Sequence, residues 1–263
     1  MTRTIQQLID LTGKTALVTG GSRGLGLQMA HALGEAGARI MLSSRKAEDL
    51  EGAVADLQAA GIDARWIAAD CAKETDLRRL ADETLQRMGP VDILVNNAGA
   101  AWGAPAEDHP VEAWDKVMNL NIRGYFILSQ HIAKHSMIPR RAGRIINIAS
   151  IAGLGGNPSD LQTIAYNTSK GAVINFTRAL ACEWGPHNIT VNAICPGFFP
   201  SRMTVGTLER MGEEKLAAHA PLRRLGDDED LKGLTVLYAS DAGKHITGQW
   251  LAVDGGVSVI TGG

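Results

Sequence analysis

The chain has 263 residues, of which 45% are hydrophobic, and its formal net charge at pH 7 is −2. This length and composition allow one large core, and the charge gives no reason to expect nucleic acid or an anionic membrane as a partner. The first ten residues are too polar for a signal peptide, no stretch is long enough to span a bilayer, and the three cysteines lack metal-ligand spacing. We therefore expect a cytoplasmic protein without a metal site, whose cysteines are reduced and buried.

Apolar, strand-like runs alternate with helix-like segments along the chain, which predicts parallel β-α-β units. The expected strands are 15–19, 39–43, 64–69, 93–95, 143–150, 190–194 and 250–253. The expected helices are 27–36, 47–60, 74–88, 111–134 and one that carries Tyr166 and Lys170 and runs to Trp184. We predict an α/β fold with a single Rossmann-type, doubly wound domain over residues 1–263. Its parallel seven-stranded sheet is expected to have helices on both faces.

Residues 200–225 interrupt this alternation. A helix is expected over 203–219, and we interpret the segment as a mobile lid over a substrate, although an ordinary amphipathic surface helix is the alternative. Phe198, Phe199, Trp102 and Leu154 are candidates for an apolar pocket lining, and each is equally suited to the core.

The first motif is Thr19-Gly-Gly-Ser-Arg-Gly-Leu-Gly26, between the first strand and the first helix. Glycines there let the backbone turn tightly, so that a phosphate can approach the free N–H groups of the helix. We expect dinucleotide contacts from Gly20, Ser22, Arg23, Gly24, Leu25 and Gly26. A turn without a binding function is one alternative. A second is the nucleophile elbow of an α/β-hydrolase, with Ser22 served by residues such as Asp160 and His187, but it leaves Tyr166 and Lys170 without a task.

The end of the second strand carries Ser44 and Arg45, and no acidic residue lies between Arg39 and Lys46. An NAD site would place an acid there to bind the ribose 2′-hydroxyl, whereas an arginine suits the 2′-phosphate of NADP. Arg23 is a second cation that could reach the same phosphate. We predict that NADPH is preferred over NADH; two solvated surface arginines are the alternative.

Tyr166 and Lys170 stand four residues apart, which on a helix puts a phenol and an ammonium on the same face. A tyrosine ordinarily keeps its proton until about pH 10, and a nearby positive charge favours the phenolate. The pair therefore indicates acid–base chemistry by Tyr166 near neutral pH. Ser150 ends the fifth strand, where ligands sit in open parallel sheets.

Together with Asn96-Asn-Ala-Gly99, Asn121-Ile-Arg-Gly124 and Pro196-Gly197, these motifs make the chain resemble the short-chain dehydrogenases/reductases over nearly its whole length. The resemblance implies that Tyr166 is the acid/base, that Lys170 binds the nicotinamide ribose and lowers the tyrosine pKa, and that Ser150 binds the reacting oxygen. It assigns a water-mediated proton relay to Asn121, the adenine to Asp70 and a wall of the cofactor groove to Asn97. Further cofactor contacts are expected at Cys71, Ala98, Gly99, Pro196, Gly197, Phe199 and Ser201.

Tyr166 follows Ser150 by sixteen positions, a longer spacing than is usual in this family, and the extra segment 157–161 is expected beside the substrate pocket. We predict an NADP(H)-dependent oxidoreductase that interconverts a carbonyl and a secondary alcohol of a small molecule. The run from Pro196 to Thr204 looks most like 3-oxoacyl-thioester reductases and gluconate dehydrogenases. A non-catalytic dinucleotide sensor is the alternative outside enzymes. The family commonly forms homotetramers, and we expect one here. Candidate interface residues are the apolar Ile174, Phe176, Leu180 and those of 257–260; the alternative is that they pack in the core.

Overall fold

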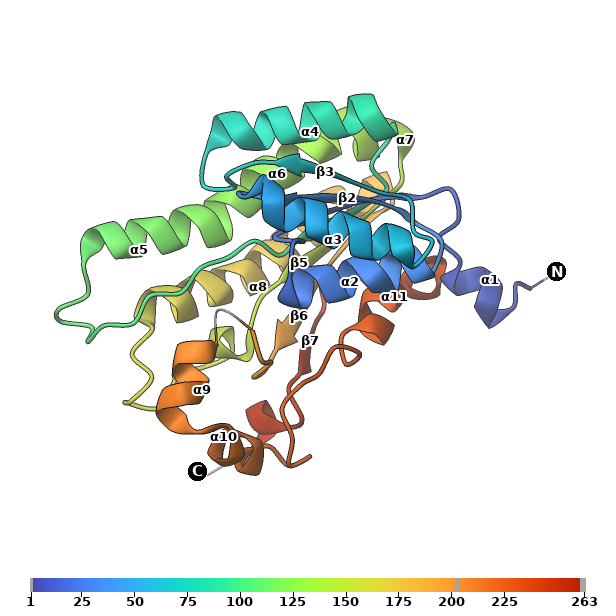
Figure 1. Cartoon of the computed structure of the whole chain (residues 1–263). Helices are drawn as coiled ribbons and strands as arrows, with labels where there is room; N and C mark the ends of the chain where they lie inside the picture. Colours follow the sequence, from blue (N-terminus) through green and yellow to red (C-terminus); the bar gives the residue numbers. More distant parts are fainter. Residues whose placement is uncertain (1, 202–203, 261–263) are drawn as a thin grey trace.

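The structure is a computed structural model that describes residues 2–201 and 204–260. At its centre is a seven-stranded parallel sheet in the order β3-β2-β1-β4-β5-β6-β7 (Figure 1). The strands are β1 (Thr15–Thr19), β2 (Arg39–Ser44), β3 (Ala64–Ala68), β4 (Ile93–Asn96), β5 (Gly143–Ile148), β6 (Ile189–Pro196) and β7 (Trp250–Val253). The chain order reverses between β1 and β4, where ligands bind in open parallel sheets. The predicted fold class is confirmed.

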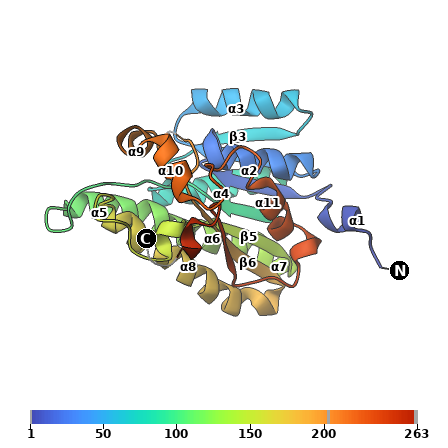
Figure 2. The same ribbon diagram turned by 90° about the horizontal axis from the view of Figure 1, so that it is seen from below.

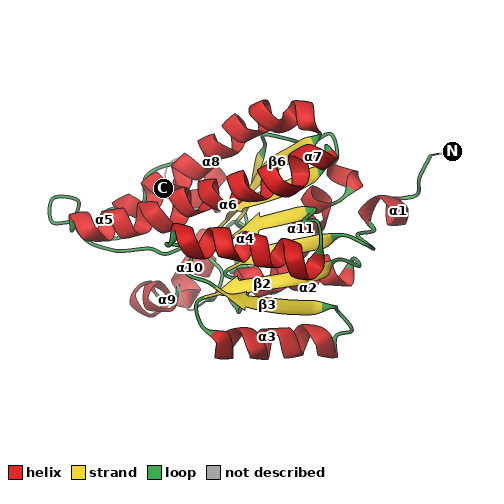
Figure 3. Ribbon diagram, turned by 90° about the horizontal axis from the view of Figure 1, so that it is seen from above, coloured by secondary structure: helices red, strands yellow, loops and turns green. Residues whose placement is uncertain are grey.

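Helices cover both faces of the sheet, which explains why β1 and β6 are buried at every residue. One face carries α2 (Gly24–Glu35), α3 (Ala47–Ala59) and α11 (Lys232–Ala239); the other carries α4 (Glu74–Met88), α6 (Gly124–Ile132) and α8 (Ile164–Trp184). Figure 3 shows α4, α6 and α8 in front of the strands. Each face has its own apolar cluster, around Leu33 and Leu57 on the first face and around Leu80 and Ile132 on the second.

The predicted helix 111–134 is interrupted and longer than expected. It consists of α5 (Val111–Met118), a π-helical segment (Asn119–Arg123), α6, a second π-helical segment (Ala133–Met137) and α7 (Ile138–Arg140). Such wide turns are frequent at functional sites, and the first of them contains Asn121. Helix α11 and the N-terminal α1 (Ile5–Ile9) were not predicted from the sequence, although Thr4 and Gln7 form a capping box at α1.

The predicted single helix 203–219 is wrong. The chain forms two short helices, α9 (Val205–Met211) and α10 (Glu213–His219), because Gly212 has a φ of 84° that breaks the helix. Met203 lies outside the described residues. Figures 1 and 2 place α9 and α10 at the end of the sheet opposite the N-terminus. Within the ranges that the structure describes, no helix is both long and apolar enough to cross a membrane.

Candidate active site

The glycine turn after β1 requires close backbone approaches. Gly20 has a left-handed φ of 63°, and a Cβ there would lie 2.8 Å from Asn97 Nδ2. A Cβ on Gly26 would lie 2.6 Å from the same nitrogen and would clash with the Gly20 carbonyl. Helix α2 begins at Gly24, three residues earlier than predicted, so its free N–H groups follow the turn directly. The turn therefore has the geometry of a phosphate cradle.

The loop after β4 braces this turn. Asn97 Nδ2 donates to the carbonyls of Thr19 at 2.9 Å and Gly20 at 3.1 Å. The backbone N–H groups of Asn97 and Ala98 donate to Thr19 Oγ1 at 3.0 and 3.2 Å. Since β1 and β4 flank the reversal in strand order, these bonds fix the two loops that meet there.

The end of β2 carries an unsatisfied hydroxyl and an unpaired cation. Ser44 Oγ is buried, and no described residue offers it a hydrogen bond. Arg45 is exposed and forms no ion pair within the described part of the chain, whereas Arg23 Nη2 lies 2.9 Å from Asp49 Oδ2. Because a buried hydroxyl without a partner is costly, this place fits a ligand with acceptor oxygens, such as the ribose 2′-phosphate of NADP.

Further cofactor contacts are predicted after β3 and β6. Asp70 Oδ1 accepts from the Ala72 N–H at 3.1 Å, and burial raises the pKa of the Cys71 thiol to about 12, so Cys71 stays protonated. Ser201 Cβ lies 3.9 Å from where a Cβ of Gly24 would stand. The segment after β6 therefore returns over the glycine turn, as expected if it closes the cofactor groove.

Gly197 follows β6 immediately and leaves no room for a side chain. Its N–H donates to the Val253 carbonyl at 3.0 Å, and a Cβ on it would lie 2.6 Å from Asp254 Cβ. The Phe199 side chain belongs to the core rather than to a pocket lining, since it is 3% exposed and its ring packs on Gly226. Trp102 is 44% exposed, and Phe198 and Leu154 are partly buried.

Tyr166 and Lys170 lie one turn apart on α8, as predicted. Lys170 is only 3% exposed, its Nζ donates to the Ile148 carbonyl at 2.7 Å, and it lies 5.6 Å from the centre of the Tyr166 ring. Ser150 Oγ accepts from the Ala152 N–H at 3.1 Å, and the Ser150 side chain is near enough to the Tyr166 phenol to lower its pKa. The expected serine, tyrosine and lysine are thus assembled at the carboxyl end of β5.

Asn121 reaches the same place from the π-helical segment. It is fully buried; its Oδ1 accepts from the Ala100 N–H at 2.9 Å, and its Nδ2 donates to the Ala100 carbonyl and to Ser169 Oγ, each at 2.9 Å. A Cβ on Gly99 would lie 3.4 Å from Asn121 Oδ1 and 3.7 Å from Lys170 Nζ. Gly99 therefore stands between the asparagine and the lysine.

The electrostatics of the pair differ from the sequence-based expectation. Burial raises the pKa of Tyr166, and the nearby Ser150 side chain offsets only part of that effect. Burial lowers the pKa of Lys170 to about 8. The expected lowering of the tyrosine pKa by Lys170 is not found, because loss of hydration opposes both charges and the ammonium bonds to a carbonyl rather than to the phenol.

Sequence reasoning missed two further side chains here. Tyr125 on α6 is 2% exposed, and its hydroxyl donates to the same Ile148 carbonyl at 3.3 Å. Cys195 at the end of β6 lies beside the Ser150 backbone, and burial raises its thiol pKa to about 11. Neither residue belongs to a motif. The third cysteine, Cys182, is exposed, contrary to the expectation that all are buried.

Two loops meet beside this site. The Ala104 N–H donates to the Gln162 carbonyl at 2.9 Å, which joins the loop after β4 to the segment before α8. Asn157 Nδ2 donates to Thr163 Oγ1 at 3.0 Å and to Asn167 Oδ1 at 3.1 Å. The extra residues between Ser150 and Tyr166 are therefore tied to the first turn of α8.

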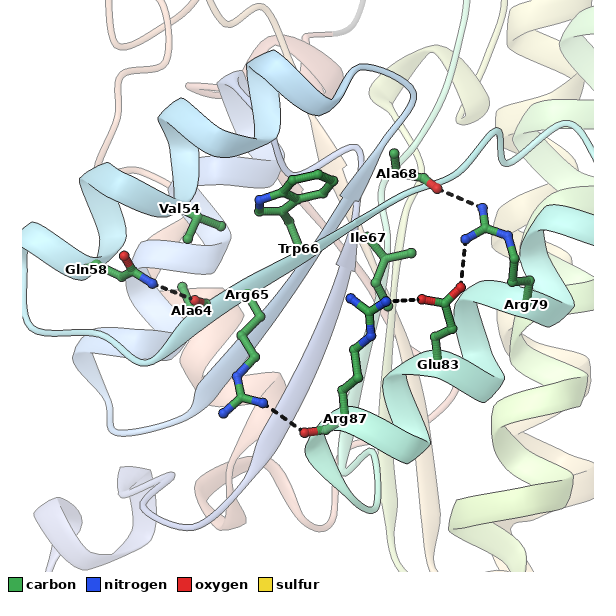
Figure 4. A pocket seen from close by; sticks show the side chains of 10 residues that line it. All are labelled: Val54, Gln58, Ala64, Arg65, Trp66, Ile67, Ala68, Arg79, Glu83 and Arg87. Carbon is green, nitrogen blue, oxygen red and sulfur yellow. Dashed lines mark hydrogen bonds and ion pairs between the residues drawn. The ribbon is translucent and has the colours of Figure 1, made fainter.

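A cavity of about 610 Å³ lies elsewhere, at the free edge of β3 between α3 and α4 (Figure 4). Its polar groups already have partners within the chain: Gln58 donates to the Ala64 carbonyl at 3.0 Å, Arg79 to the Ala68 carbonyl at 2.8 Å and to Glu83. Side chains that occupy edge carbonyls hinder the addition of another strand. We interpret this cavity as a protected sheet edge.

The hydrolase alternative does not assemble. Ser22 follows the carboxyl end of β1, whereas His187 precedes the amino end of the parallel strand β6. The eight residues of β6 span roughly 25 Å at about 3.3 Å per residue. His187 and Ser22 therefore lie at opposite ends of the sheet, too far apart for proton transfer.

Comparisons with known proteins identify the family of the chain. The family model described as short chain dehydrogenase matches residues 14–211. The chain belongs to the short-chain dehydrogenase family. It is 38% identical over 260 residues to a gluconate 5-dehydrogenase of Gluconobacter oxydans, covering 96% of this chain and 97% of the relative. It is 40% identical over 251 residues to a rhamnolipids biosynthesis 3-oxoacyl-[acyl-carrier-protein] reductase of Pseudomonas aeruginosa, covering 94% and 97%.

Among solved structures, a gluconate 5-dehydrogenase from Burkholderia cenocepacia in complex with NADP and tartrate superposes with a TM-score of 0.92. The two sequences are 32% identical, and the match covers 98% of this chain and 100% of that one. The predicted family and enzyme class are thereby confirmed, and the hydrolase is not favoured.

Proposed function

We propose that this short-chain dehydrogenase is an NADP(H)-dependent oxidoreductase that interconverts a carbonyl and a secondary alcohol. The observation that carries the proposal is the convergence of Ser150, Tyr166 and Lys170 beside the glycine turn, at the carboxyl ends of β5 and β1. Its curated relatives are a dehydrogenase and a reductase, and one similar solved structure contains NADP.

The residues assigned to the phosphates of the cofactor support NADP in particular. We assign the phosphates to the turn from Gly20 to Gly26 and the 2′-phosphate to Ser44 and Arg45. Arg45 is the main contact because it has no partner among the described residues, whereas Arg23 is held by Asp49. An arginine fork binds a phosphate through paired, charge-assisted hydrogen bonds.

The reaction needs a hydride, which the nicotinamide cofactor supplies or accepts when it is bound. The side chains of this protein move the proton. In reduction, Ser150 and Tyr166 donate hydrogen bonds to the substrate oxygen, and the phenol transfers its proton as that oxygen gains electrons. The raised pKa of Tyr166 keeps this proton in place near neutral pH. Once the proton has left, the charge of Lys170 offsets part of the cost of the buried phenolate, and Asn121 is assigned to the relay that restores the proton.

The substrate is either a sugar acid or a 3-oxoacyl thioester, the classes named by the two curated relatives. A panel of both classes, read by the absorbance of the reduced nicotinamide, decides between them. With the best substrate, Tyr166→Phe should lower kcat by at least ~10²-fold, since only the ionisable oxygen is removed. NADPH binding, followed by fluorescence, should persist. Near-normal turnover by Tyr166→Phe would refute the mechanism.

We also propose that the chain forms a homotetramer. Ile174 and Leu180 are buried within the single chain, so the core alternative holds for them. The exposed apolar side chains include Val259 and Ile260 of the predicted segment 257–260. They also include Phe126 on α6, Ile164 on α8 and Leu251 on the edge strand β7. We assign these side chains to the interfaces of a homotetramer.

Helices α9 and α10 are assigned to a lid over the substrate. The three free cysteines fit a cytoplasmic location.

A further inference from the structure

The buried ammonium of Lys170 needs more support than its one carbonyl. An ammonium has three donors, and the donor bond that the structure records for Lys170 runs to the Ile148 carbonyl at 2.7 Å. The side chain is almost fully withdrawn from water, which opposes its charge. Two aromatic rings flank the nitrogen, those of Tyr166 and Tyr125, each with its centre 5.6 Å away.

Tyr125 differs from Tyr166 because it takes no part in the assigned proton transfer. Its ring face attracts the cation, an interaction that is strongest where water is excluded. Its hydroxyl donates at 3.3 Å to the carbonyl of Ile148, which also accepts from Lys170, so the ring is anchored to the same backbone atom as the lysine. We propose that Tyr125 is a positioning residue for Lys170: the face of its ring holds the lysine ammonium in place beside the Ile148 carbonyl.

The local sequence explains how Tyr125 reaches this place. Gly124 lets α6 approach the chain after β3 closely, because a Cβ there would lie 2.6 Å from the Cys71 carbonyl. The π-helical segment Asn119–Arg123 ends immediately before Gly124. Asn121 and Tyr125 then both point inward and are buried. The helix that delivers the assigned relay asparagine thus also delivers the ring that flanks the lysine.

The titratable groups around Lys170 have higher pKa values than the lysine itself. The titratable side chains that face Lys170 are Tyr166 on its own helix, Tyr125 on α6 and Cys195 on β6. The negative charge of Asp254 contributes to the raised pKa of the Cys195 thiol. Burial raises the pKa of both tyrosines above 10 and that of Cys195 to about 11. Lys170, with a pKa of about 8, is therefore the group that loses its charge between pH 7 and 9.

The inference rests on the proposed function, in which a charged Lys170 is needed for reduction. The rate of carbonyl reduction, as kcat/KM, should then fall above about pH 8 in the wild type. Tyr125→Met fills the space without an aromatic face and should move this fall to lower pH by roughly one unit, a tenfold change in the ionisation constant. Tyr125→Phe keeps the ring and should restore the wild-type position of the fall.

Leu128→Ala, a buried change on the same helix, is the matched control for lost packing. It should lower Tm without moving the pH profile. If Tyr125→Met lowers Tm or kcat but leaves the profile of an active enzyme in place, Tyr125 is only a packing residue and the inference is wrong. The same holds if Tyr125→Phe shifts the profile as far as Tyr125→Met. A wild type that reduces no carbonyl of the panel would instead overturn the proposed function.

Discussion

Replacing Lys170 by methionine should stabilise the protein while abolishing its activity. Lys170 is 3% exposed, and burial lowers its pKa from 10.5 to about 8. The unfolded chain therefore binds more protons than the folded chain between pH 8 and 10.5. The buried ammonium therefore lowers the free energy of unfolding by its full amount below pH 8. This destabilisation disappears as the pH rises from 8 to 10.5. Methionine has a similar length and no charge to bury.

The magnitude follows from the size of the pKa change. A lowering by about 2.5 units corresponds to about 3 kcal/mol of unfolding free energy at pH 7, and about 1 kcal/mol of it remains at pH 10. Methionine also loses the bond to the Ile148 carbonyl, worth about 1 kcal/mol. The loss is limited because the Tyr125 hydroxyl still donates to that carbonyl. Lys170→Met should therefore gain about 2 kcal/mol at pH 7 and almost nothing at pH 10.

The assay compares thermal unfolding of wild type and Lys170→Met at both pH values. At pH 7 the variant should melt about 4 °C higher, and at pH 10 the two curves should coincide. Lys170→Arg is the matched control, since it keeps a charge that does not titrate and should show no such convergence. If Lys170→Met is no more stable than the wild type at pH 7, or if its advantage is the same at pH 10, the buried-charge reasoning is refuted.

Three further outcomes are expected. Arg45→Asp should raise the KM for NADPH about ten- to a hundred-fold and leave NADH use equal or better, measured as kcat/KM for both cofactors, because one charge-assisted phosphate contact is lost; equal weakening of both cofactors would contradict the assignment. Gly26→Ala should abolish NADPH binding in a fluorescence titration, since its Cβ would clash with the Gly20 carbonyl, and tight binding would argue against the cradle. Light scattering should give about four times 27.9 kDa, and a stable monomer would exclude the tetramer.

The parts of the site that could be predicted from the sequence are local in the chain. Tyr166 and Lys170 are one helical turn apart, and the glycines from Gly20 to Gly26 lie between one strand and one helix, so their spacing alone sets their relative positions. The alternation of strands and helices likewise predicts a parallel sheet with helices on both faces. These features needed no knowledge of tertiary contacts.

The parts that were missed depend on contacts between distant segments. Tyr125 and Cys195 reach Lys170 and Ser150 only because α6 and β6 pack beside α8 and β5. Nothing in their local sequence marks them. The break between α9 and α10 has a local cause in Gly212, but a single glycine inside a helical pattern does not by itself indicate a left-handed φ.

The pKa of Tyr166 shows why even a correctly predicted pair can be assigned the wrong electrostatics. Spacing places a cation near a phenol, and from this alone the tyrosine pKa should fall. Folding also removes both groups from water, and that cost depends on every element packed around them, among them α6, β6 and the turn Ile151–Gly153. Gly153 illustrates the crowding, because a Cβ there would lie 2.5 Å from the Lys170 carbonyl carbon. Charge proximity can be predicted from the chain, whereas desolvation requires the packed fold, and here desolvation determines the direction of both shifts.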